Sequence, residues 1–436
     1  MNIFDFLYPK YKISKPIKLI ELFAGYGSQA LALEYLGIPF THHKICEWAI
    51  PSIIAYCDLH ITNKKEFCSD LTKEQIAYEL YNYGVSIDYN KPATLNQLKR
   101  MPESKLRLAF NSILNTNNLV NIQKVKGRDL DFDSDDEVIM TYSFPCQDLS
   151  LAGLGKGMKK GSGTRSGLLW EVERILVERE RENLPLPTIL LMENVPQVIN
   201  KQNVDDFNKW QLRLEQFGYH NYHQLLNAKD YGIPQNRNRC FMVSILGDYS
   251  YSFPKKQKLK LILKDMLEDE VDEKYYLSKK QIQDVSKGIC QTLSTMGGNN
   301  VGVVVLGNYS PSKHNASRVV DSEGLALTIM ENHGTVTAIL DKDNYIQWQE
   351  KGRLDIDCRA YKEDKIAPTT TTTPKTKIIN NLRIRKLTPL ECWRLMGVKD
   401  EDFEKVKVHQ SESSLYHLAG DSIVVNVLME IFKELL

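Results

Sequence analysis

Short apolar runs alternate with helix-type patterns along the first 247 residues. Four apolar runs predict buried strands: Lys18–Phe23, Val138–Thr141, Thr188–Met192 and Arg239–Ile245. One helix is expected over Ser28–Leu36, which Gly37 ends, and another over Ser166–Arg181, where the apolar residues share one face. Strands that alternate with helices predict an α/β fold, in this case a doubly wound and mostly parallel sheet.

The pattern changes twice along the chain. Residues 57–118 form a polar, helix-rich insertion to which the sequence assigns no role. After about residue 249 come short strands, such as Val301–Leu306 and Thr335–Leu340, among many turn residues. The last twenty residues are again apolar and helical. We therefore expect two domains, a first one over 1–247 that is completed by 411–436, and a smaller, irregular, β-rich one over 248–410.

The composition agrees with this organisation. A chain of 436 residues, 42% of them hydrophobic, is longer than a single hydrophobic core usually supports. The net charge of +1 gives no overall sign of a nucleic-acid-binding protein. No apolar run approaches the roughly 18 residues of a membrane span, and the first residues lack the apolar stretch of a signal peptide. Eight cysteines without CxxC pairs or nearby histidine clusters predict reduced thiols in a cytoplasm, without a disulfide framework or a metal site.

One cysteine is expected in the loop that follows the end of a strand. The run Val138–Thr141 leads into Ser-Phe-Pro-Cys-Gln-Asp-Leu-Ser at 143–150. Ligands of open α/β sheets bind outside the carboxyl ends of the strands, so Cys146 lies where chemistry is expected. Pro145 fixes its own φ and favours an extended Phe144, which limits how the cysteine is presented.

A glycine turn follows the first predicted strand. Gly25, Gly27 and Ala30 satisfy the dinucleotide pattern GxGxxG/A, in which glycines let the backbone approach a ligand at a helix N-terminus. The pattern suits NAD, FAD or S-adenosylmethionine almost equally. Glu47 could accept both ribose hydroxyls, and the indole of Trp48 offers a face for adenine. A surface carboxylate beside a core tryptophan is the alternative.

Two further segments place charged residues at strand ends. Glu193 directly follows an apolar strand and is a candidate acid, with a helix cap as the alternative. Arg237 and Arg239 precede another strand and point to the same face, which suits a phosphate or a base edge, or else structural ion pairs. Together with Cys146, these residues fit conjugate addition to a pyrimidine: a thiolate attacks C6, an acid acts at N3, and C5 becomes the nucleophile.

Eight ordered segments resemble the motifs of DNA (cytosine-5) methyltransferases of the bacterial or phage type, and they span nearly the whole chain. They are ELFAGYGSQ, CEWA, SFPCQDLS, AGLGKGMKKGSGTRSGLLWE, MENV, QNRNRCF, RKLTPLECWRLMG and AGDSIVVNVL. The resemblance implies the Rossmann-like fold of S-adenosylmethionine-dependent methyltransferases. It also implies S-adenosyl-L-methionine as methyl donor and double-stranded DNA as substrate.

The resemblance assigns roles to the residues that match each motif. Cys146 is expected to be the nucleophile and Glu193 its acidic partner, with Arg237 and Arg239 completing the catalytic set. The residues expected to bind the cofactor are Phe23, Ala24, Gly25, Tyr26, Gly27, Glu47, Trp48, Asn121, Ile122, Pro145, Leu169, Asp421 and Ser422.

Three departures from the family pattern concern the cofactor pocket. Asn121 stands where the family usually has an aspartate at the adenine amino group, and Asp129 is the second candidate for that position. Asp421 replaces the asparagine of Gly-Asn-Ser, and Ser28 follows the second glycine of the first motif where another glycine is usual. None of the three touches the catalytic set.

The implied reaction requires the cytosine to rotate out of the duplex, because its reacting atoms are unreachable inside the stack. The second domain is expected to read sequence in the major groove, with these candidate readers: Asn299, Asn300, Lys313, His314, Arg318, Asn332 and His333. We expect a cytoplasmic monomer without a metal, acting alone or beside a restriction endonuclease that cuts the same site.

Three other functions share part of this pattern. A nicotinamide dehydrogenase would share the glycine turn and Glu47, but it would not account for the PCQ and QNRNR segments. An RNA cytosine methyltransferase would share the catalytic motifs and lack so large a second domain. A non-catalytic DNA-binding protein on the same fold would be expected to have lost Cys146 or Glu193.

Overall fold

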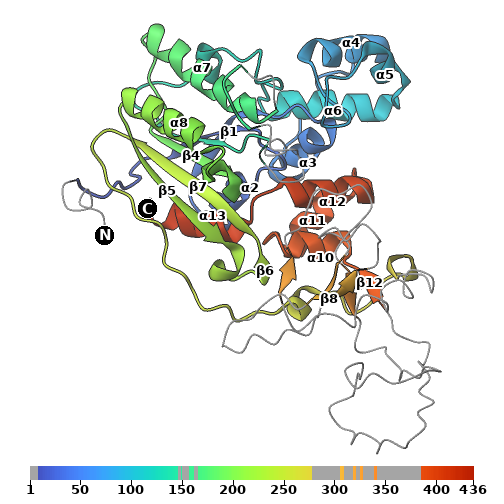
Figure 1. Ribbon diagram of the computed structural model, residues 1–436. Coiled ribbons are helices and arrows are strands. Elements are labelled where there is room, and N and C mark those ends of the chain that lie inside the picture. The colour runs from blue at the N-terminus through green and yellow to red at the C-terminus, as the bar shows by residue number, and fades with distance from the viewer. Residues whose placement is uncertain are drawn as a thin grey trace, which may run out of the picture.

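A six-stranded sheet forms the centre of the protein (Figure 1). The computed structural model describes residues 8–145, 149, 157–161, 165–276, 305–308, 318–320, 325–327, 338–340 and 384–436. In spatial order the strands are β2 (Phe40–Cys46), β1 (Ile17–Leu22), β3 (Glu137–Tyr142), β4 (Ile189–Asn194), β7 (Asn238–Leu246) and β5 (Tyr219–Asn227). Only β7 runs antiparallel to its neighbours. The predicted mostly parallel α/β sheet is therefore confirmed.

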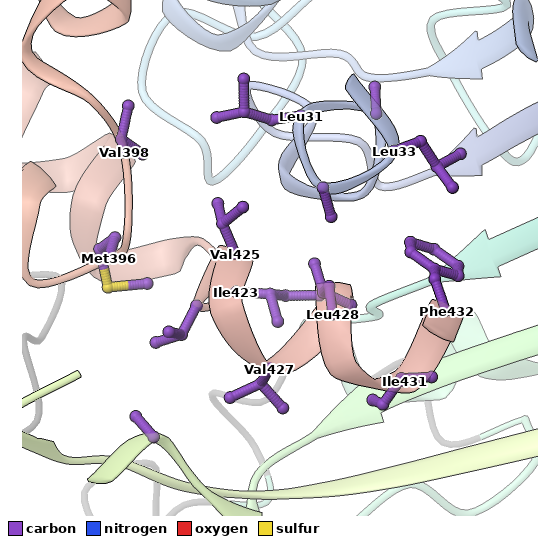
Figure 2. Packing of buried hydrophobic residues seen from close by; sticks show 14 of the residues in the cluster. Leu31, Leu33, Met396, Val398, Ile423, Val425, Val427, Leu428, Ile431 and Phe432 are labelled. Atoms are coloured by element: carbon purple, nitrogen blue, oxygen red, sulfur yellow. The ribbon is translucent and has the colours of Figure 1, made fainter. Parts of the chain in front are cut away.

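Helices cover both faces of the sheet, each over its own apolar cluster. On one face lie α2 (Ser28–Leu36) and α13 (Val425–Lys433), and on the other α7 (Leu169–Arg181) and α8 (Val204–Gln216). Figure 2 shows α2 lying next to α13, with Leu33 of α2 pointing towards Phe432 of α13. The C-terminal helix α13 is thus part of this apolar cluster.

The insertion is a helical layer with a core of its own. It contains α4 (Lys73–Tyr83), α5 (Leu95–Arg100) and α6 (Glu103–Asn115), which pack with α3 (Ile50–His60) in a separate apolar cluster. Thr72 and Thr94 form capping boxes that start α4 and α5. The isolated pairing of Ala49 with Ser86 ties this layer to the end of β2.

Between residues 277 and 386 the described residues of the predicted second domain form short strands. A four-stranded sheet has the order β12 (Ile384–Lys386), β11 (Ala338–Leu340), β9 (Arg318–Val320), β8 (Val305–Asn308). A separate pair joins β10 (Ala326–Leu327) to β6 (Gln235–Asn236) in the first domain. Of the candidate DNA readers only Arg318 is described, as the first residue of β9; Asn299, Asn300, Lys313, His314, Asn332 and His333 lie outside the described residues.

The helices α10 (Pro389–Arg394) and α11 (Asp400–Lys407) belong by packing to the first domain. Trp393 stacks on Tyr26 with ring centroids 4.6 Å apart, and the Tyr35 hydroxyl donates to Asp402 at 2.6 Å. Both helices share the apolar cluster of α2 and α13. We therefore propose that the second domain ends near residue 384, earlier than the expected boundary at 410.

One stretch, Glu412–Lys433, is long and apolar enough to cross a membrane by length and composition alone. It consists of α12 (Glu412–Asp421) and α13, and most of its apolar window, 67%, is buried inside the protein. The sequence shows no unbroken apolar run of that length here, because polar residues such as Asp421 and Ser422 interrupt it. Since the buried core helices of soluble proteins pass the same test, we assign the stretch to the core.

Candidate active site

A cavity of about 860 Å³ opens at the carboxyl ends of the parallel strands. Its volume falls within the range of about 300–1,000 Å³ typical of cofactor and small-molecule sites. The predicted site residues that line it are Phe23, Gly25, Glu47, Trp48, Asn121, Ile122, Pro145, Glu193, Arg237, Arg239, Asp421 and Ser422. Residues expected to bind the cofactor and residues expected to act on the substrate thus share one cavity. Cys146 lies outside the described residues. It follows Pro145 in the sequence, and Pro145 lines the cavity.

The glycine turn presents backbone to this cavity. Phe23 has a φ of 60°, which is costly for a residue with a side chain, and its N–H donates to the carbonyl of Cys46 at 2.8 Å. Gly25 has a φ of 57°, and a Cβ added to it would meet no atom within 4 Å. Open space beside a glycine on a cavity wall is what close approach of a ligand to the backbone requires.

Glu47 is held at the end of β2 by backbone donors. Its carboxylate accepts from the N–H of Gly25 at 3.0 Å and from the N–H of Ala49 at 2.8 Å. Burial raises the pKa of Glu47 to about 7, and the nearby Asp421 acts in the same direction. Asn118, which the sequence analysis missed, accepts from the N–H of Glu47 at 3.0 Å and donates to its carbonyl at 2.9 Å.

The insertion supplies part of the cavity wall. Tyr89 and Asn90 line the cavity beside Trp48. The ring of Tyr89 lies on that of His417 of α12, with centroids 3.6 Å apart. Tyr89 has a φ of 62°, which costs a non-glycine residue about 1–3 kcal/mol and recurs at ligand sites. The sequence offered no signal for this contact, because the insertion and α12 are far apart along the chain.

Glu193 and Arg239 face each other across neighbouring strands. Glu193 of β4 pairs with Phe241 of β7, and Arg239 lies two residues along the same face of β7. This diagonal brings the Arg239 Nε to 3.1 Å from a Glu193 carboxylate oxygen. The other carboxylate oxygen accepts from the Ser143 hydroxyl at the end of β3. Glu193 is only 6% exposed, and these two partners fix the orientation of its carboxylate group.

Arg237 lies on the same wall with different contacts. Its guanidinium donates to the carbonyls of Gly420 and Ser422 at 2.9 and 2.6 Å, and the residue is 4% exposed. These bonds hold the segment that carries Asp421 against β6 and β7. Arg237 is expected in the catalytic set, and from these contacts we propose that it acts there as a positioning residue.

Two buried side chains fix the backbone that leads to Cys146. Asn194, at the end of β4, donates to the carbonyl of Phe144 at 2.9 Å. Ser166 donates to the carbonyl of Pro145 at 2.7 Å. Asn194 and Ser166 are 2% and 0% exposed. The two carbonyls before the cysteine are therefore tethered by two later parts of the chain, the end of β4 and the residues that precede α7.

Four of the expected cofactor residues do not line the cavity. Tyr26 is buried against Trp393, Gly27 backs onto Tyr56 and His60, and Leu169 and Ala24 are buried in apolar clusters. Asn121, the first choice at the adenine position, lines the cavity. Asp129, the second choice, does not line it and accepts from the N–H of Lys126 at 2.8 Å.

The comparisons with known proteins decide the family. The family model of C-5 cytosine-specific DNA methylases matches residues 103–436. The chain belongs to this family. It is therefore a DNA (cytosine-5) methyltransferase of the bacterial and phage type, and S-adenosylmethionine is the methyl donor of such enzymes.

Curated bacterial relatives cover much or all of this methyltransferase. The Type II methyltransferase M2.ScrFI of Lactococcus lactis subsp. cremoris is 33% identical over 96% of this chain and 99% of its own. The orphan methyltransferase M.SssI of Spiroplasma monobiae is 38% identical over 61% of this chain and 68% of its own. The crystal structure of the S. pombe Dnmt2 methyltransferase matches with a TM-score of 0.55 and 15% identity over 97% of this chain and 98% of that one, which shows the shared fold alone.

The cavity of this methyltransferase fits S-adenosylmethionine. A nucleoside needs a hydroxyl acceptor and an aromatic face, which Glu47 and Trp48 supply on one side of the cavity. The amino acid part needs backbone donors and acceptors, and the open backbone at Gly25 lies on the same wall. Glu47 is held in place by Asn118 and by the backbone, so this acceptor is pre-organised.

Proposed function

We propose that this enzyme methylates C5 of a cytosine that has rotated out of a specific duplex sequence, through a covalent bond between Cys146 and C6. The Glu193–Arg239 pair at the cavity wall, 3.1 Å apart, carries the proposal. The proposal is further supported by the hydrogen bonds that Asn194 and Ser166 donate to the two backbone carbonyls before Cys146. A nucleophile that follows a fixed backbone, beside a fixed carboxyl group, suits addition to an aromatic ring.

In the proposed reaction the Cys146 thiolate adds to C6 while Glu193 stabilises the proton at N3. The electron pair of the 5,6 double bond then makes C5 a carbon nucleophile. S-adenosylmethionine supplies a methyl sulfonium electrophile when bound. Loss of the C5 proton and expulsion of the Cys146 thiolate restore the aromatic ring as 5-methylcytosine. Arg239 orients Glu193, and its positive charge favours the thiolate.

We assign the cofactor end of the cavity to the glycine turn, with Glu47 at the ribose, Trp48 and Ile122 beside adenine, and Asn121 at the adenine amino group. Ser422 and Asp421 close the amino acid end. The support for this assignment is that these residues line one cavity with the catalytic pair. Tyr26, Leu169, Gly27 and Ala24 would then act from behind the wall, by fixing the turn and α7.

The test is transfer of labelled methyl from S-adenosylmethionine to unmethylated duplex DNA, followed by bisulfite sequencing of the product. Label at C5 of cytosine within one short motif is the expected result and identifies the recognised site. Transfer to tRNA in place of duplex DNA would overturn the choice of substrate. Absence of any transfer by a protein that binds the cofactor would overturn the proposed catalytic set.

We further propose that the region between about residues 277 and 383 selects the DNA sequence. The position of this region between two segments of the catalytic core supports the assignment. Exchanging it for the corresponding region of the M.SssI enzyme should move the methylated motif to that of the donor. An active chimaera with unchanged sequence preference would overturn the assignment.

We also propose a cytoplasmic monomer that protects DNA from a restriction endonuclease cutting the same site. The Type II name of the Lactococcus lactis relative supports this role. DNA methylated by the enzyme should resist a restriction endonuclease that cuts the same site, while unmethylated DNA is cut. If methylated and unmethylated DNA are cut alike, the protective role is wrong, and we infer an orphan enzyme, like the Spiroplasma relative.

A further inference from the structure

Three potential metal ligands converge behind the glycine turn, outside the catalytic cavity. They are Glu34 of α2, His42 of β2 and His60 at the end of α3, whose ligand atoms all lie within 4.8 Å of one another. One Glu34 oxygen lies 2.7 Å from the His60 Nδ1 and 3.6 Å from the His42 Nε2. The His60 side chain is fully buried, while Glu34 is 33% exposed. Solvent thus reaches the cluster at Glu34 and, to a smaller extent, at His42, which is 20% exposed.

Each histidine is oriented by a partner at its other ring nitrogen. The His60 Nε2 lies 2.9 Å from the carbonyl of Tyr26, which can only accept. His60 therefore carries a proton on Nε2, and in its neutral form the Nδ1 lone pair faces Glu34. Histidine ligands of metals almost always donate their second N–H in this way, often to a backbone carbonyl.

His42 is oriented through a longer chain of hydrogen bonds. Its Nδ1 lies 2.9 Å from the Tyr56 hydroxyl, which donates to the buried carboxylate of Glu21 at 2.5 Å. Because the Tyr56 proton is directed to Glu21, the Tyr56 oxygen accepts from the His42 Nδ1–H. The His42 Nε2 is then left with a lone pair directed at Glu34.

We propose that Glu34, His42 and His60 bind one divalent transition metal ion of the Zn²⁺ class, with a fourth position open to water. Two imidazole lone pairs and a carboxylate that meet without a donor between them are balanced by a cation. Two histidines and one glutamate are a known ligand set for Zn²⁺. The competing arrangement is an ion pair between Glu34 and a doubly protonated His60, without a metal.

The position of the site suggests what the ion does. Its ligands come from α2, which follows the glycine turn, and from β2 and α3, which contact the turn. A Cβ added to Gly27 would lie 2.4 Å from the His60 Nε2, so the site backs directly onto the turn. A bound ion would join the three elements at the rear of the cofactor cavity and raise the stability of this region. It would take no part in methyl transfer.

Binding of Co²⁺ to the full-length, chelator-treated protein tests the proposal. We expect one Co²⁺ per chain with the visible absorption of a tetrahedral nitrogen and oxygen site, and without the thiolate-to-cobalt bands that binding to cysteines would give. Glu34→Gln removes the most exposed ligand and should abolish this signal. His43→Gln is the matched control, because His43 is the next residue of β2 and contacts the carbonyls of Leu130 and Asp131 instead.

A second variant separates loss of the site from loss of the fold. Tyr56→Phe keeps the ring and removes only the hydroxyl that orients His42, and loss of such a partner weakens metal binding by about 10- to 100-fold. Circular dichroism is the control that checks whether each variant is folded. Absence of saturable Co²⁺ binding by the wild type, or equal affinity in the wild type and Glu34→Gln, would overturn the proposal and leave the ion pair.

Discussion

Replacing Glu47 by glutamine perturbs an acidic side chain that backbone N–H groups hold in the part of the cavity that we assign to the cofactor. Glu47 is 9% exposed, and its two oxygens accept from the N–H groups of Gly25 and Ala49. In Glu47→Gln one oxygen becomes an amide NH₂ that faces a backbone donor. One hydrogen bond is lost and a buried donor is left without an acceptor, which costs about 1–3 kcal/mol of stability.

The stability difference between the variant and the wild type should depend on pH. Burial raises the pKa of Glu47 from 4.5 to about 7. The folded state therefore holds this proton more tightly than the unfolded chain does. The stabilisation that results is fully present below about pH 4.5 and is lost as the pH rises to about 7. It amounts to about 3 kcal/mol, since one pKa unit is worth about 1.4 kcal/mol.

Glutamine does not titrate, so the deficit of Glu47→Gln should shrink as the pH rises. We expect the variant to be less stable than the wild type by about 1–3 kcal/mol near pH 4.5, and of similar or higher stability at pH 8. Urea unfolding at the two pH values measures this. An equal difference at both pH values would refute the assignment of a buried, proton-binding carboxylate at this position.

The same variant should bind S-adenosylmethionine more weakly. Loss of a charge-assisted hydrogen bond to a ribose hydroxyl costs about 1.5–3 kcal/mol, which corresponds to about a 10- to 150-fold higher Kd by titration calorimetry. Asp129→Asn is the matched control, because Asp129 loses the same charge but does not line the cavity. If the Kd of Glu47→Gln lies as close to the wild-type value as the Kd of Asp129→Asn does, the ribose assignment is refuted.

Three other substitutions test the remaining parts of the site. Cys146→Ser should keep folding and cofactor binding and abolish methyl transfer; full activity would contradict its role as nucleophile. Asn194→Ala removes the bond to the Phe144 carbonyl and should cost about 1–3 kcal/mol in urea unfolding. It should also lower kcat while the Kd for S-adenosylmethionine stays within about twofold; an unchanged kcat would contradict the tether. Tyr89→Ala should raise that Kd by opening the wall, whereas Tyr81→Ala, an exposed position of the same insertion, should not.

The sheet was largely predictable because its buried strands are short apolar runs. The expected strand Val138–Thr141 lies within β3, and Thr188–Met192 overlaps β4. The strands β2 and β5 were missed because they lie at the two edges of the sheet and carry polar residues such as His43 and Gln224. An edge strand has a neighbour on one side only, so its sequence needs less apolar surface, and the apolar signal weakens.

The chemistry of the site was more predictable than its support. Motif residues such as Glu193 carry a distinctive sequence context, and the structure brings them to one cavity. Some of the residues around them carry no such context: Asn118 and Tyr89 lie outside every motif and are ordinary polar residues until the chain is folded. Each acts on a partner distant in sequence, such as Glu47, which lies 71 residues from Asn118. Single-sequence patterns report on neighbours along the chain and not on such pairs.

One extended segment connects the two ends of the cavity. Arg239 faces Glu193 at the catalytic end, while Arg237, two residues earlier, donates to carbonyls that lie 183 and 185 residues further along the chain. Those carbonyls flank Asp421 at the cofactor end. Because α13 is buried against α2 and the sheet, the C-terminal segment has a fixed position for Arg237 to hold. The two arginines of this segment thus connect the Glu193 carboxylate to the stretch that carries Asp421, and that stretch lines the cavity only because the chain returns to the sheet.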